Sequence, residues 1–111
     1  MITSFKIYNR FYYLRTTNPR SPELEIKGSF CYGVHNFSTS EIIIDNSLND
    51  DLFVETVRHE LSHAIFDFTC HNAENYTEEQ ICELIGMHGG TISDIANDLL
   101  NEWKRYNGRG E

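Results

Sequence analysis

Residues 59–63 read His-Glu-Leu-Ser-His, an HExxH pattern within a stretch of helical periodicity. On an α-helix, residues four apart lie about 40° apart around the axis, so both imidazoles can reach one metal ion. Glu60 lies about 60° from His63, on the same side. Two neutral imidazoles can hold Zn²⁺ with coordination positions left open, and a carboxylate can take the proton of a water molecule that zinc has acidified. The pattern predicts a zinc-peptidase site with His59 and His63 as ligands and Glu60 as the base.

The residues around this motif favour the metal site over the alternative, two surface histidines beside a solvated glutamate. Apolar side chains gather on one face of the expected helix, while His59 and His63 project to another side, next to Leu52 and Phe66. A solvated helix face would not need Leu52 and Phe66 at those positions. The face itself comprises Leu52, Phe53, Val54, Thr56, Val57, Leu61, Ala64, Ile65 and Phe68.

A catalytic zinc ion usually has three protein ligands, and the following helix is expected to supply the third. Glu78 lies on the apolar stripe of that helix, three residues before Ile81 and seven before Ile85, so Glu78 is the first choice. A modest rotation of the helix would bring in Glu79 instead. Acidic residues in a first helical turn are also favoured by the helix dipole alone, so a purely structural role stays open for both.

The other candidates for the third ligand are His71, Glu83 and His88. We prefer a structural role for His88, because an imidazole near a helix C-terminus is stabilised by the dipole. Cys70 and His71 form a further pair of conceivable ligands, but a small buried cysteine beside a helix end is the favoured interpretation.

The first half of the chain carries strand signals, because short runs are rich in β-branched and aromatic residues. Turn and loop composition separates these runs, most clearly at Asn18 to Pro22 and Asn36 to Ser40. The expected strands cover residues 5–8, 11–15, 24–27, 29–34 and 41–45.

Three helices are expected after these strands. The first carries the motif and opens near residues 47–51, with Ser47, Asn49 or Asp50 as the cap. The second starts at Thr77, whose spacing to Gln80 is that of a capping box, and ends at Gly89-Gly90. The third covers about 91–106 with a strong amphipathic pattern. The expected fold is one α+β domain over residues 1–111, with a small antiparallel or mixed sheet in about 1–46 and three helices in about 48–106.

Composition narrows the class of protein. A formal net charge of −8 in 111 residues argues against nucleic acid as a partner, because phosphate binding needs a basic face. The sequence suggests neither a signal peptide nor a membrane-spanning run. Three cysteines without CxxC spacing fit free thiols in a reducing compartment. We expect a cytoplasmic protein with no membrane or nucleic-acid partner.

Four segments considered together carry a resemblance to a known family: Tyr32-Gly33, residues 41–45 (EIIID), residues 56–65 (TVRHELSHAI) and residues 78–82 (EEQIC). They resemble the minimal ImmA/IrrE-like zinc metallopeptidases of phages, prophages and mobile elements. The resemblance implies a zincin-like fold and a gluzincin-type site, with His59, His63 and Glu78 on zinc and Glu60 as base. Ile81-Cys82 stands where the family often has Ala followed by Asn or Asp, which keeps Glu79 open as the alternate ligand.

In such an arrangement a sheet edge holds the extended substrate through backbone hydrogen bonds. The candidates for this edge are residues 41–45 and the neighbouring residues 31–35. Tyr32 or His35 would then assist the oxyanion, although we prefer to interpret His35 as an ordinary turn residue.

Two functions follow as expectations. The first is a zinc-dependent peptidase that acts on a protein or peptide substrate, such as a regulatory protein, by metal-activated water with Glu60 as base. The alternative is a non-catalytic binding module on the same scaffold, whose metal is structural or absent. The small size and the acidic surface support the alternative.

Overall fold

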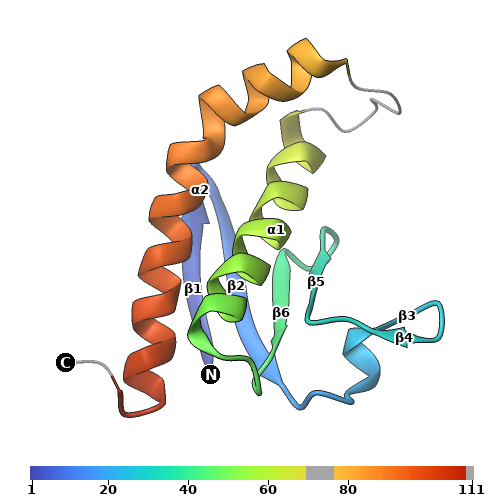
Figure 1. Cartoon of the computed structure of the whole chain (residues 1–111), viewed down its shortest axis with the longest axis vertical. Coiled ribbons are helices and arrows are strands. Elements are labelled where there is room, and N and C mark those ends of the chain that lie inside the picture. Colours follow the sequence, from blue (N-terminus) through green and yellow to red (C-terminus); the bar gives the residue numbers. More distant parts are fainter. Residues whose placement is uncertain (70–76, 110–111) are drawn as a thin grey trace.

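The computed structural model describes residues 1–69 and 77–109. A sheet-forming half is followed by two long helices (Figure 1). The strands are β1 (Ile2–Ile7), β2 (Arg10–Thr17), β3 (Glu25–Ile26), β4 (Ser29–Phe30), β5 (Gly33–Asn36) and β6 (Glu41–Asp45). A short 3₁₀ helix, η1 (Pro22–Leu24), precedes β3, and the two α-helices are α1 (Asp50–Thr69) and α2 (Glu78–Tyr106).

The main sheet is mixed, with strand order β1-β2-β6-β5. β1 and β2 form an antiparallel hairpin, β2 and β6 are parallel, and β5 returns antiparallel to β6. β6 is therefore internal, while β1 and β5 are the edges. β3 and β4 pair only with each other as a two-stranded hairpin.

The expectation of three helices is wrong, because the described residues contain two α-helices. Gly89-Gly90 does not end the second helix, which continues from Glu78 to Tyr106. Each glycine costs a helix only about 1 kcal/mol relative to alanine, and neither residue adopts a positive φ. The predicted capping box at the start of the helix is confirmed: Gln80 N donates to Thr77 Oγ1, and Thr77 N donates to Gln80 Oε1. Packing of the later turns against the core then keeps the helix continuous through the glycines.

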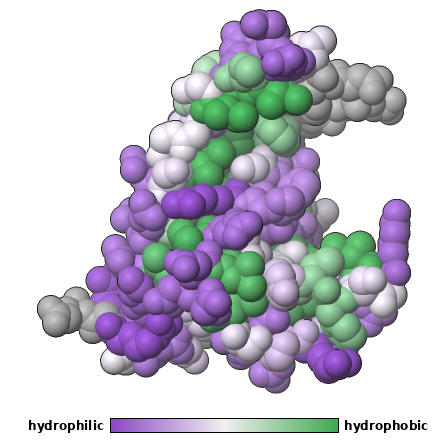
Figure 2. Space-filling view, in the orientation of Figure 1, coloured by the Kyte–Doolittle hydropathy of each residue, from purple (hydrophilic) through white to green (hydrophobic). Residues whose placement is uncertain are grey.

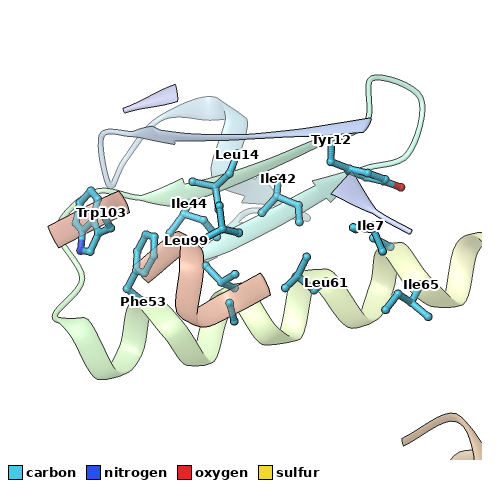
Figure 3. Close-up of a cluster of buried hydrophobic side chains, with 13 residues drawn as sticks. Ile7, Tyr12, Leu14, Ile42, Ile44, Phe53, Leu61, Ile65, Leu99 and Trp103 are labelled. Atoms are coloured by element: carbon cyan, nitrogen blue, oxygen red, sulfur yellow. The ribbon is translucent and has the colours of Figure 1, made fainter. Parts of the chain in front are cut away.

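Both helices lie over one face of the main sheet, and the core fills the space between them (Figures 1 and 3). Alternation along β2 directs Tyr12 and Leu14 into this core and leaves Phe11 and Tyr13 exposed on the opposite face. Phe53 of α1 and Trp103 of α2 stack with ring centroids 4.8 Å apart and planes 3° from parallel. This stack joins the first turns of α1 to the last turns of α2.

The described helices also bear on membrane topology. None of them combines the length and the apolar character that crossing a bilayer requires.

Candidate functional site

Helix α1 positions the HExxH residues midway along its length. Asn49 caps the helix, since its side-chain Oδ1 accepts from Leu52 N at 2.9 Å. One side of α1 is buried against the sheet through Val57, Leu61 and related residues. With that side of α1 buried, His59 and His63 are exposed. Glu60 lies between the buried and exposed sides of the helix, with 6% of its surface accessible.

The two histidines face each other across one turn of α1. Their Nε2 atoms lie 3.2 Å apart, and their rings meet edge to face with centroids 4.8 Å apart. Two imidazole nitrogens on a tetrahedral zinc ion, each about 2.0–2.1 Å from the metal, are separated by about 3.3 Å. The spacing of the histidine nitrogens therefore fits one zinc ion, and the donor set suits this metal.

A groove of about 560 Å³ runs beside these histidines. Helix α1 forms one wall, with His59, Glu60 and His63 among its lining residues. The other wall comes from β5 and the segment before it, with Tyr32 and Val34 among the lining residues. Since β5 is an edge of the sheet, the groove lies along unpaired backbone as well as along the histidines.

Gly33 allows β5 to approach α1 this closely. A Cβ atom at this position would lie 2.7 Å from Thr56 Cγ2, 2.8 Å from Ile44 Cδ1 and 3.3 Å from Glu60 Cγ. Any larger residue would push β5 away from the wall that holds Glu60. Tyr32-Gly33 is part of the resemblance in sequence, but this packing role of Gly33 depends on contacts between distant segments and has no local sequence signal.

Burial controls the electrostatics of Glu60. Loss of solvent raises the pKa of its carboxyl group, and the neighbouring His59 and His63 act in the opposite direction. A carboxylate with a raised pKa holds a proton more readily at near-neutral pH, as a group that takes and returns a proton must.

A second pair of titratable groups borders the groove. His35 Nδ1 lies 3.2 Å from Asp67 Oδ2. His35 is in strand β5, so our preference for a turn residue is wrong. Burial lowers the pKa of His35, while Asp67 raises it and His63 lowers it further. Asp67 was missed in the sequence, although its position four residues after His63 places it on the same face of α1.

No third candidate ligand joins His59 and His63 in the part of the chain that the structure describes. No group of three His, Cys, Asp or Glu side chains there could hold a metal ion. Glu78 and Glu79 form the exposed first turn of α2, and Glu83 is exposed on the same helix, so none joins the histidines in this arrangement.

Of the remaining candidate ligands, His88 has another partner, and two lie outside the residues that the structure describes. His88 Nδ1 is paired with Tyr8 Oη at 2.5 Å. Cys70 and His71 lie outside the described residues. Cys31 lines the groove, and Cys82 is exposed on α2 as a free thiol.

Comparison with known proteins adds no relative: no protein-family model, curated protein or solved structure matches this chain.

Proposed function

We propose that this protein is a zinc-dependent peptidase of the ImmA/IrrE-like type, acting on a protein or peptide substrate. The observation that carries the proposal is the 3.2 Å separation of His59 Nε2 and His63 Nε2, beside the buried carboxyl of Glu60 and on a groove. A pair of surface histidines without a metal function would need neither the groove nor a buried carboxylate between them.

His59 and His63 would hold the metal through their Nε2 atoms. When bound, zinc polarises a substrate carbonyl and acidifies a water molecule toward a pKa of about 7. The carboxylate of Glu60 takes the proton of the attacking water and later returns it to the leaving amine. Burial of Glu60 supports this role, because burial favours the protonated form that the second step requires.

Strand β5 is the place for the substrate backbone. An extended peptide can add to an exposed sheet edge through main-chain hydrogen bonds, and β5 is the edge that borders the groove. The alternative edge, residues 41–45, is wrong because β6 pairs with β2 on one side and with β5 on the other. A peptide on β5 would run past His59 and His63.

The state of the described cysteines is consistent with a cytoplasmic location of the proposed reaction. Cys31 and Cys82 are free cysteines, as in proteins of reducing compartments. We therefore propose that the reaction takes place in the cytoplasm.

The second candidate is a binding module that uses the same groove without cleavage. It is favoured by one observation, namely that no third ligand joins the two histidines within the described residues. The two candidates differ in whether a Glu60-dependent reaction takes place.

The test combines metal content with cleavage. Mass spectrometry of protein purified without chelator should find about one zinc per chain in the wild type and none in His59→Ala or His63→Ala. Glu60→Gln should keep zinc and lose cleavage of a peptide library by at least about 100-fold. Glu102→Gln, an exposed glutamate on α2, is the matched control and should keep both.

Each candidate has its own contrary result. Zinc binding with no cleavage of any library member by the wild type would favour the binding module. Undiminished cleavage by Glu60→Gln would exclude Glu60 as the base.

A further inference from the structure

Helix α2 contains three glycines within five residues, and none is required by packing. A Cβ atom at Gly86 or Gly90 would meet nothing within 4 Å, and one at Gly89 would meet only Ile85 of the same helix, at 3.8 Å. None of the three adopts a positive φ. Glycine destabilises a helix relative to alanine, so their effect here is on the backbone itself. They make one short stretch of α2 easier to bend than the rest.

This stretch separates two unlike parts of α2. The part after the glycines is packed into the core through Ala96, Leu99 and Trp103. The part before Gly89, residues 78–88, which we term the arm, is largely exposed: Ile85 and Met87 are 65% and 66% accessible. In Figure 1 the arm leans away from the axis of the remaining helix and passes over the end of α1. Figure 2 shows apolar surface over this region.

The base of the arm is fixed at one point. Tyr8, in the turn between β1 and β2, contacts His88 through Oη and Nδ1, and their rings meet edge to face with centroids 5.5 Å apart. His88 lies between Gly86 and Gly89. The sheet therefore holds α2 at the flexible stretch while leaving the rest of the arm exposed.

We propose that Gly86, Gly89 and Gly90 form a hinge that closes the arm over the groove and delivers Glu78 to the His59–His63 pair. This inference rests on the proposed zinc site. The arm is about 15 Å long at 1.5 Å per residue, so a rotation of about 40° moves its tip by about 10 Å. His63 lies six residues before the end of α1, about 9 Å along the axis. A hinge motion of ordinary size thus moves the tip of the arm by a length similar to the part of α1 that lies beyond His63.

The sequence of the arm supports closure on this face. Glu78, Ile81 and Ile85 stand at i, i+3 and i+7, on one side of the helix. Closure that turns Glu78 toward the histidines also turns these two exposed isoleucines toward the protein. The arm then loses apolar surface to solvent in the same step that completes the metal site.

The experiment stiffens the hinge and follows zinc binding together with arm position. The variant Gly86→Ala, Gly89→Ala, Gly90→Ala strengthens the helix without a steric clash. Its matched control, Asn97→Ala with Asn101→Ala, strengthens exposed positions in the packed part of α2. Zinc affinity is measured by competition with a chromophoric chelator. Arm position is measured by pulsed electron paramagnetic resonance between spin labels on Cys82 and on Ser38→Cys, with Cys31 and Cys70 replaced by serine.

We expect zinc to shift the label distance in the wild type and in the asparagine control. The alanine triple variant and Glu78→Ala should show no shift and bind zinc at least about 10-fold more weakly. Equal or tighter zinc binding by the triple variant would overturn the hinge and leave the two-histidine site intact. Absence of zinc binding by the wild type would overturn both proposals.

Discussion

Gly33 is the residue on which the groove depends most directly, because a single added methyl group would clash with α1 and β6. Gly33→Val should destabilise the protein by about 1–3 kcal/mol through overpacking. Thermal unfolding should show a fall of about 4–8 °C for each kcal/mol lost. Gly86→Ala is the matched control, since nothing lies within 4 Å of its added Cβ atom and it should gain up to about 1 kcal/mol. Equal melting temperatures for the two variants would contradict the close approach of β5.

Glu60 should make the stability of the metal-free protein depend on pH. Burial raises its folded pKa above the unfolded value of about 4.3. The folded state then binds more protons than the unfolded state, so this contribution to stability is full below the unfolded pKa and is lost as pH rises through the folded pKa. Glu60→Gln does not titrate and should therefore gain stability relative to the wild type as pH rises above the unfolded pKa of about 4.3.

Urea unfolding of both metal-free proteins across this range measures the difference. Glu102→Gln makes the same substitution at an exposed position of α2, where the side chain pairs with Arg105, and serves as the control. A Glu60→Gln difference that stays constant with pH would show that the carboxyl titrates normally.

Among the residues of the site, the sequence was sufficient to predict those whose positions depend on helical periodicity alone. The four-residue spacing of His59 and His63 was enough to predict that they share a face, and their Nε2 atoms are indeed 3.2 Å apart. Gly33 and the His35–Asp67 pair bring together segments distant in the chain, so no local pattern could reveal them.

Among the helices and strands, the cap at the start of α2 can be tested separately by its effect on the stability of the arm. Thr77→Ala removes the oxygen that accepts from Gln80 N and should cost about 1 kcal/mol. The loss should fall on the exposed arm, because residues after the glycines are held by the core. Amide hydrogen exchange should therefore speed up in residues 78–86 and stay unchanged in 95–103. Uniform acceleration along α2 would show that the helix opens as one unit.

Element boundaries were harder to predict than element types. Gly89-Gly90 predicted a helix end, but the cost of two glycines is smaller than the gain from the Thr77 cap and the Trp103 packing. Residues 29–34 were expected as one strand, yet they form β4 and the start of β5 with a break at residues 31–32. A single β-rich run does not show where a strand changes its partner.

For the whole molecule, the stack of Phe53 on Trp103 couples the two helices. Phe53→Ala should cost about 3–5 kcal/mol, a large part of the 5–15 kcal/mol typical of a domain. Trp103 is the only tryptophan, so its fluorescence reports on this contact in urea unfolding, alongside far-ultraviolet circular dichroism. The control Phe11→Ala, at 64% accessibility, should cost less than about 1 kcal/mol. In the wild type the two signals should change together. Separate transitions would mean that the helices do not unfold as one unit.

The β3–β4 hairpin pairs with no strand of the main sheet, yet Ile26 of β3 and the adjoining Cys31 and Tyr32 line the groove. The part of the rim that β3 and β4 form is thus separate from the hydrogen bonding of the main sheet, whereas Tyr32 O accepts from Asp45 N of β6 at 2.8 Å. Residues 25–30, which form β3, β4 and their turn, can change in length and composition without disturbing the histidines on α1. If the groove binds a peptide as proposed, exchange of this hairpin would alter which peptides fit, and residues 25–30 are the segment to randomise in a laboratory selection.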